Sequence, residues 1–153
     1  MKHLKRFNED ITSFNFEEDL QDFCEMNLAY LLDEGTEVSV GETQNGNYVK
    51  IKFDKMKSWD EIKDHIIPFA TRLNNKYEME RNPMIGHDNV RIWIYTTRLV
   101  PGTGSMTRKI EDLINDDVWK DIQPQLILDI DIYIKGYKQE KKSVLTKIKS
   151  FFK

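Results

Sequence analysis

The stretch LILDIDIYIKG at residues 126–136 alternates large apolar side chains with aspartates and a tyrosine at a period of two. An extended strand turns successive side chains to opposite faces, so this stretch predicts a strand with one buried side and one polar side. Such a strand requires a sheet whose apolar face is covered by other parts of the chain. The expected buried side carries Leu126, Leu128, Ile130, Ile132 and Ile134, and the polar side carries Asp129, Asp131 and Tyr133.

Three further runs show the same alternation and predict three more strands. In residues 36–53, two of these runs flank the pair Asn45-Gly46. An Asn-Gly pair favours the positive φ angles of a type I′ turn, so the two runs predict a β-hairpin. Residues 89–98 contain the third run, NVRIWIYTTR. The apolar sides of these runs carry Val38, Val40, Val49, Ile51, Phe53, Val90, Ile92 and Ile94.

Three other stretches space their apolar residues as a helix does, at residues 15–35, 58–77 and 105–122. The second begins with Ser58 and Glu61, which match the capping box of a helix start. The first ends at a glycine, which favours the termination of a helix. These stretches therefore predict three amphipathic helices between the strands.

Together the elements predict an α+β fold in the order α-β-β-α-β-α-β-α. Four strands with one apolar face each form a single, mainly antiparallel sheet, and helices cover that face to give a two-layer sandwich. The length of 153 residues suits one domain with a sizeable core. We expect a basic leader at residues 1–14, one α+β domain at residues 15–137 and a basic amphipathic helix at residues 138–153.

The charge of the chain is unevenly distributed. The formal net charge is −3, but residues 138–153 carry six lysines against one glutamate, and residues 1–8 are also basic. The body between these ends is therefore acidic. Because affinity for phosphates requires positive charge gathered on one surface, an acidic body argues against general nucleic-acid binding.

The single cysteine, Cys24, excludes an internal disulfide and a cysteine-based zinc cluster. It lies in the first predicted helix, where a thiol usually acts as a small hydrophobe. The chain contains no secretory apolar region and no apolar run of membrane-spanning length. We expect a protein without a membrane span, located in a reducing cytoplasm.

The polar side of the predicted sheet is the main candidate for a binding surface. Aromatic residues and arginine are enriched in protein interfaces. Aromatic residues among basic ones are also typical of platforms that stack single-stranded nucleic acid. The candidate binding residues are Lys50, Lys52, Arg91, Trp93, Tyr95, Asp129, Asp131 and Tyr133.

The sequence predicts no catalytic residue, no cofactor and no metal site. Asp129 and Asp131 lie about 7 Å apart on one side of their strand, but no third ligand has credible spacing. The three histidines are scattered, with no cysteine or carboxylate at ligand spacing. The glycine-bearing stretch 100–109 is expected to be a loop that could present N–H groups to an anion, although turn chemistry explains its glycines equally well.

The basic tail offers a second surface. A lysine-rich amphipathic helix suits an anionic membrane or the groove of a protein. Because the apolar stripe extends over only about two turns, we expect the tail to dock on protein. The stripe contains the docking residues Leu145, Ile148, Phe151 and Phe152.

The opening MKHLKRFNED resembles the short openings of small accessory proteins of tailed, T4-like bacteriophages, in which Met-Lys precedes a leucine or aromatic residue, a phenylalanine and a glutamate. In some of those proteins the leader directs the chain to the prohead and is cut after a glutamate. The matching residue here is Glu9, whereas Phe7 departs from the leucine or isoleucine usual two residues before the cut. The resemblance covers the first nine residues or so and implies a phage origin.

These observations predict a non-enzymatic phage accessory protein that binds another protein, either a host factor or a component of the virion. Its expected location is accordingly the cytoplasm of the host cell or the virion. One alternative is a nucleic-acid-binding module that uses the aromatic and basic sheet face. A metal-dependent enzyme using Asp129 and Asp131 is a third alternative, and formation of a homo-oligomer is left open.

Overall fold

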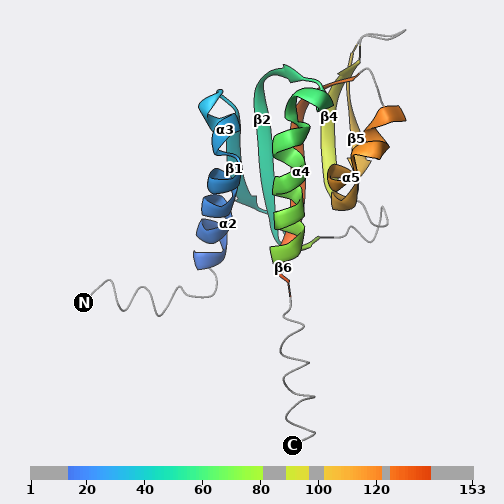
Figure 1. Cartoon of the computed structure of the whole chain (residues 1–153). Coiled ribbons are helices and arrows are strands. Elements are labelled where there is room, and N and C mark those ends of the chain that lie inside the picture. Colours follow the sequence, from blue (N-terminus) through green and yellow to red (C-terminus); the bar gives the residue numbers. More distant parts are fainter. Residues whose placement is uncertain (1–13, 81–88, 97–101, 122–124, 139–153) are drawn as a thin grey trace, which may run out of the picture.

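The computed structural model describes residues 14–80, 89–96, 102–121 and 125–138 (Figure 1). Helices and strands alternate irregularly along the chain. Their order is α2 (Phe14–Asn27), α3 (Ala29–Asp33), β1 (Glu37–Glu42), β2 (Asn47–Lys57), α4 (Trp59–Lys76), β3 (Tyr77–Met79), β4 (Val90–Thr96), β5 (Gly102–Arg108), α5 (Ile110–Ile114), the 3-10 helix η1 (Asp116–Asp121) and β6 (Gln125–Tyr137).

The strand with the strictest alternation, β6, lies in the middle of the sheet. The strands lie side by side in the order β1-β2-β6-β4-β5, and all neighbours are antiparallel. The short β3 pairs with the C-terminal end of β6. The predicted antiparallel sheet is therefore confirmed, but the described residues contain six strands where the sequence predicted about four.

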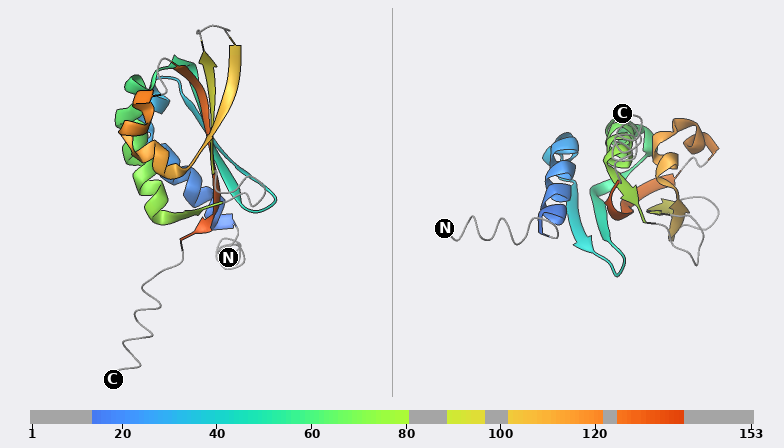
Figure 2. Two further views of the ribbon diagram at one scale, coloured as in Figure 1. Left: turned by 90° about the vertical axis from the view of Figure 1, so that its right-hand side faces the viewer. Right: turned by 90° about the horizontal axis from the view of Figure 1, so that it is seen from below.

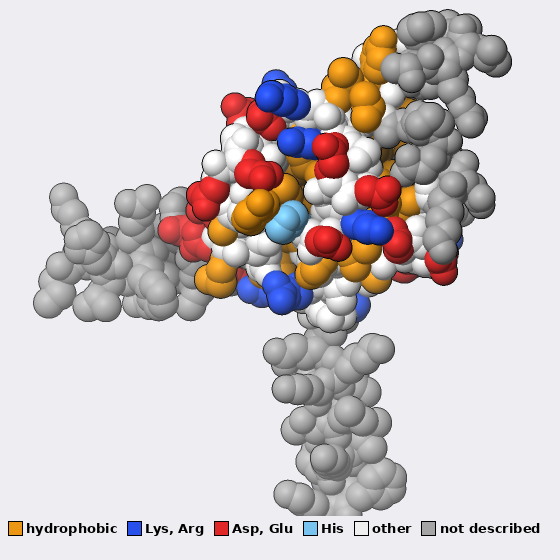
Figure 3. Space-filling model, turned by 45° about the horizontal axis from the view of Figure 1, so that its top comes forward, with side chains coloured by type: hydrophobic (Ala, Val, Ile, Leu, Met, Phe, Trp, Pro, Cys, Tyr) orange, Lys and Arg blue, Asp and Glu red, His pale blue; other side chains and the backbone are white. Residues whose placement is uncertain are grey.

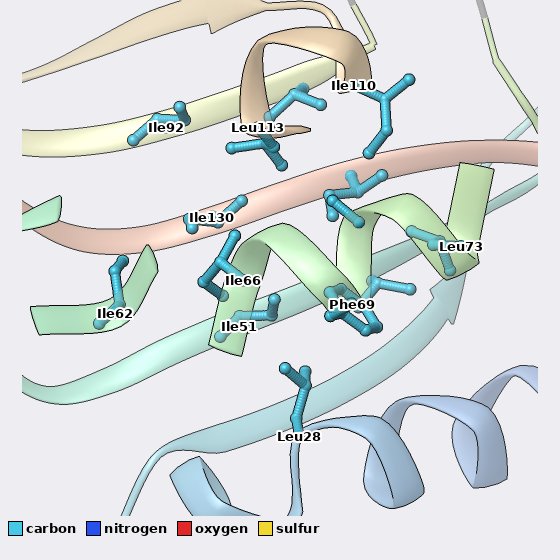
Figure 4. Packing of buried hydrophobic residues seen from close by; sticks show 14 of the residues in the cluster. Leu28, Ile51, Ile62, Ile66, Phe69, Leu73, Ile92, Ile110, Leu113 and Ile130 are labelled. Atoms are coloured by element: carbon cyan, nitrogen blue, oxygen red, sulfur yellow. The ribbon is translucent and has the colours of Figure 1, made fainter. Parts of the chain in front are cut away.

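All the helices of the described residues lie on one side of the sheet, as the left view of Figure 2 shows. Apolar residues of α4 point at the sheet, and Figure 4 shows Ile66 and Phe69 of this helix beside Ile51 and Ile130 of the strands. These four side chains are fully buried and belong to one core cluster. Burial of this apolar surface is the main contribution to stability, and it explains the predicted two-layer arrangement.

The helix starts and stops follow local sequence signals. At the start of α4, the Ser58 N–H donates to Glu61 Oε2 at 2.7 Å, as a capping box requires. Gly35 adopts a φ of 101°, which favours glycine and ends the first helical region. That region is interrupted at Leu28, which separates α2 from α3, so the single helix predicted there is wrong in this detail.

The third predicted helix is also shorter than expected. The described part of this stretch, residues 105–121, instead contains the end of β5, the five-residue α5 and η1. Trp59 and Trp119 stack with ring centroids 4.2 Å apart, which holds η1 against α4. The indole N–H of Trp59 donates to Asp116 Oδ1 at 2.7 Å, and that of Trp119 donates to the Asp112 carbonyl at 3.0 Å.

The predicted buried side of β6 is correct only beyond a β-bulge. Ile130, Ile132 and Ile134 are fully buried, but the register shifts between Trp93 and Ile94 of β4, whose partners are Asp129 and Ile127. Between these two pairs β6 advances by two residues while β4 advances by one, which is a β-bulge in β6.

This bulge reverses the faces expected at the N-terminal end of β6. Ile127 fills the core, whereas Leu126 pairs with Tyr95 on the opposite face and Leu128 is only half-buried. The expectation that Leu126 and Leu128 share the buried side is therefore wrong.

Two turn predictions are also corrected. The hairpin of β1 and β2 is confirmed, with Val38 opposite Ile51 and Val40 opposite Val49. Its turn spans residues 43–46, and neither Asn45 nor Gly46 has a positive φ, so it is not of type I′. Of the stretch expected as a loop at residues 100–109, residues 102–108 form β5, because their backbone pairs with the free side of β4.

The end of β6 is tied to α2 through Asp19. Its Oδ2 accepts hydrogen bonds from the hydroxyls of Tyr137 at 2.9 Å and Tyr77 at 3.4 Å, and lies 3.1 Å from Lys76 Nζ. Burial acts to raise the pKa of Asp19, but these partners outweigh burial and hold the pKa below its ordinary value. Asp19 therefore stabilises the fold at neutral pH, and this contribution is lost as the pH falls through the lowered pKa.

Cys24 is fully buried, and this burial raises the pKa of its thiol to about 12. The thiol is thus protonated and packs as a small apolar group, as the sequence predicts. Among the described residues, no helix is long and apolar enough to cross a membrane. The predicted leader, apart from Phe14, and the tail beyond Lys138 lie outside the described residues.

Candidate functional site

The sheet face opposite the helices brings together all eight of the predicted binding residues. Described helices cover only the other side, so we call this surface the open face (Figure 2). Cross-strand pairing fixes which residues share it. Its rows are Lys50–Asp131–Arg91, Lys52–Asp129–Trp93, Tyr48–Tyr133 and Leu126–Tyr95.

Asp131 is the centre of the open face. It is only 8% exposed although no described helix covers it, because side chains of the flanking strands surround it. Lys50 Nζ lies 3.8 Å from Asp131 Oδ1, and the indole N–H of Trp93 donates to Asp131 Oδ2 at 3.1 Å. Asp131 thus forms an ion pair with Lys50, and its hydrogen bond with Trp93 also orients the Trp93 ring.

Asp129 has a different environment from Asp131. Burial raises the pKa of Asp129, and the nearby charge of Asp131 raises it further, while Lys50 and Lys52 lower it. The net pKa lies above the ordinary value of an aspartate. Ionised Asp129 therefore opposes folding, and folding becomes more favourable as the pH falls toward and below this pKa.

Several buried polar atoms of the open face have no hydrogen-bond partner in the part of the chain that the structure describes. They are Arg91 Nε, Asp129 Oδ1 and Asp131 Oδ1. Leaving a buried donor or acceptor unbonded costs about 1–3 kcal/mol, so these atoms reduce the stability of the folded chain.

Aromatic and apolar side chains surround these polar atoms. Tyr48, Trp93, Tyr95 and Tyr133 are each half-buried, so part of every ring is open to a partner. Leu126 joins them, because the bulge places it opposite Tyr95. Alternation alone could not have assigned Leu126 to this face, since a bulge leaves no regular signal in the sequence.

The described residues contain no group of three or more histidine, cysteine, aspartate or glutamate side chains that could hold a metal ion. The two oxygens of Asp131 face Lys50 and the Trp93 indole N–H, which are a cation and a hydrogen-bond donor. Such neighbours compete with a metal ion for the carboxylate. The open face is thus better arranged for ion pairing than for metal binding.

The helical side of the molecule differs from the open face. Figure 3 shows acidic and basic side chains interspersed over this side, with apolar surface between them. The most exposed apolar residues are Met26 and Tyr30, and the Tyr30 ring stacks on His65 at 4.6 Å. Scattered apolar residues of this kind are common on solvated surfaces.

A hollow of about 760 Å³ lies at the end of the sheet and contains none of the predicted binding residues. It is lined partly by Asn74, Glu78, Glu111 and Lys138. Ligand pockets are usually lined by apolar side chains with a few polar ones, so this charged hollow is a weaker candidate than the open face.

Comparison of the chain with protein-family models, with curated proteins and with solved structures gives no match. The open face is therefore interpreted from its own geometry.

Proposed function

We propose that this chain is a non-enzymatic binding module that contacts a protein partner through the open face. The observation that supports this proposal is the combination of half-buried aromatic rings with charges that neutralise one another. Protein interfaces favour such surfaces, because aromatic residues contribute much of the binding energy and net charge is low at the centre.

The charge balance distinguishes a protein partner from nucleic acid. Lys50 and Arg91 are both opposite Asp131. Lys52 has Asp129 on one side and Glu37 on the other. Each basic group of these rows therefore has an acidic neighbour, which weakens attraction for phosphates. A protein that brings its own donors and acceptors does not depend on net positive charge.

The fixed orientation of Trp93 supports the same proposal. Its hydrogen bond to Asp131 limits the rotation of the ring before any partner arrives. A side chain ordered in advance loses less entropy on binding and so contributes more to affinity. Trp93 is therefore the expected energetic centre of the interface, with Tyr95 and Leu126 beside it.

The partner is proposed to be a host factor or a virion protein, in keeping with the resemblance of the N-terminal leader to phage accessory proteins. The test captures proteins from the native host with the purified chain and then measures the affinity of each captured protein. Tyr95→Ala should abolish binding of the true partner. Tyr30→Ala removes the same ring from the helical side and should leave binding unchanged.

A partner that binds the Tyr95→Ala variant as tightly as the wild-type chain would contradict the proposal. Labelled single-stranded oligonucleotides provide the test of the main alternative. Binding that weakens steeply with salt and is lost on changing Lys50 and Lys52 to glutamine would replace the protein-binding proposal with nucleic-acid binding.

A further inference from the structure

The strand β5 forms one edge of the sheet and is unusually unprotected. It is last in the strand order, and among the described residues no strand pairs with its outer side. The left view of Figure 2 looks onto this edge. Residues 102–107, GTGSMT, contain no charge and no proline, and their pairing with β4 has no bulge. Natural edge strands usually contain a charge, a proline or a bulge, each of which hinders pairing with another chain.

The strand β1, at the opposite edge of the sheet, carries charges that β5 lacks over residues 102–107. The strand β1 has an acidic residue at each end, Glu37 and Glu42. Charged side chains on an edge strand disfavour its pairing with another chain. The two edges of one sheet therefore differ, since β1 carries a charge at each end whereas β5 carries only Arg108, at its C-terminal end.

The backbone direction of β5 follows from one hydrogen bond. The Tyr133 N–H donates to the Asn89 carbonyl at 2.9 Å, so the carbonyl just before β4 faces β6, whereas the Asn89 N–H donates to the Arg108 carbonyl of β5 at 3.2 Å. Because backbone groups alternate between the two neighbours of a strand, even-numbered residues of β4 face β5. The same alternation along β5 directs the N–H and C=O groups of Thr103, Ser105 and Thr107 outward.

We propose that two copies of the chain pair antiparallel through β5, with Ser105 of one copy opposite Ser105 of the other. A two-fold axis then passes between the two serines, as in most homodimers. Thr103 faces Thr107 of the second copy, and the outward backbone groups of both strands hydrogen-bond to each other. The two sheets become continuous.

Side-chain sizes support this register. On the helix side of the sheet, Met106 would face Gly104 of the second copy, and Arg108 would face Gly102. A Cβ added to either glycine would meet nothing within 4 Å, so open space is available there. Met106 is only partly buried in its own core and could extend into that space. The alternation of large and absent side chains is thus self-complementary, which favours a second copy over an unrelated peptide.

An interface made of edge strands buries less surface than a standard stable complex. The dimer is therefore expected to be weak and to dissociate on dilution. The dimer adjoins the open face, because Ser105 is the cross-strand partner of Trp93, but it is held by the outward backbone groups of β5 and not by the aromatic rings. Tyr95→Ala should leave the dimer intact, so failure of this inference and failure of the proposed function are distinguishable.

Disulfide trapping tests the register directly. Opposed residues of a hydrogen-bonded antiparallel pair have Cα atoms about 5.5 Å apart, within the range of a disulfide. Ser105→Cys should give a covalent dimer on mild oxidation of the full chain. Ser39→Cys, at an exposed position on the opposite edge, should give little, and the buried Cys24 should not react. Equal cross-linking of the two variants, or none of Ser105→Cys, would overturn the proposal.

Sedimentation velocity over a concentration series gives the second test. The wild-type chain should show a reversible monomer–dimer equilibrium, and Ser105→Lys should weaken it several-fold by placing two lysines opposite each other. Ser39→Lys is the matched control and should have no effect, with folding of both variants checked by circular dichroism. A wild-type chain that stays monomeric, or a dimer that Ser105→Lys leaves unchanged, would refute pairing through β5.

Discussion

The two faces of the sheet are built from the same strands but depend on different physical properties. On the covered face, Ile51, Ile92 and Ile130 are 0% exposed and pack against helices as one aliphatic layer. On the open face, the neighbouring positions hold charges and aromatic rings with specific partners. Side-chain volume therefore determines the first face, and pairwise chemistry determines the second.

The largest expected effect comes from the covered face. Ile130→Ala should reduce the free energy of unfolding by about 2–5 kcal/mol, because it leaves a cavity in the core. Lys52→Ala, one row away on the open face, should change it by less than about 0.5 kcal/mol. Urea unfolding followed by circular dichroism measures both values. Similar losses for the two variants would remove the distinction between the faces.

A smaller loss is expected within the open face itself. Trp93→Phe keeps an aromatic ring but removes the N–H that donates to Asp131 Oδ2. Since the carboxylate then loses its donor while it stays buried, the free energy of unfolding should fall by about 1–3 kcal/mol. Tyr95→Phe serves as the control and should have little effect. An unchanged stability of Trp93→Phe would show that Asp131 is satisfied by water instead.

For Asp129, substitution is expected to raise the stability of the fold instead of lowering it. Burial, together with Asp131, raises the pKa of Asp129, so its ionised form disfavours folding at neutral pH. Asp129→Asn should therefore raise the melting temperature slightly at neutral pH, and this gain should disappear in acid, where the wild-type carboxyl is protonated. Thermal unfolding across this pH range tests the prediction. A lower melting temperature at neutral pH would mean that Lys50 and Lys52 outweigh the burial.

No effect is expected from divalent ions. A ligand that binds only the folded state raises stability by RT ln(1 + [L]/Kd), which is about 2.7 kcal/mol at a hundredfold excess over Kd. Mg²⁺ or Mn²⁺ should leave the melting temperature unchanged in the wild-type chain and in a double variant with Asp129→Asn and Asp131→Asn. An ion-dependent rise that the double variant abolishes would favour the metal-dependent enzyme.

The sequence predicted the open face well because its signal is periodic. Alternation in β2, β4 and β6 places the charged and aromatic residues on one side, and pairing of these strands then brings them together. The bulge at Leu128 was not predictable in the same way, since it depends on how β6 fits between two neighbours. Only the assembled sheet determines that Ile127 is the residue that fills the core.

The missed strands have a related explanation. The strand β3 has three residues, too few to show a period. The strand β5 has small polar residues and glycines in place of alternating apolar ones, so its sequence resembles a loop. It becomes a strand because β4 offers unpaired backbone groups. Long-range pairing thus overrides weak local preference at both places.

The central position of β6 determines when the sheet can be completed during synthesis. This strand follows every other described strand in the sequence, yet it separates the β1–β2 hairpin from the β4–β5 hairpin. During synthesis, both hairpins leave the ribosome before the strand that joins them. Each then presents an unpaired inner edge, and such edges associate readily with other chains. A nascent chain halted after β5 should therefore bind chaperones or aggregate, and release of β6 should end that exposure.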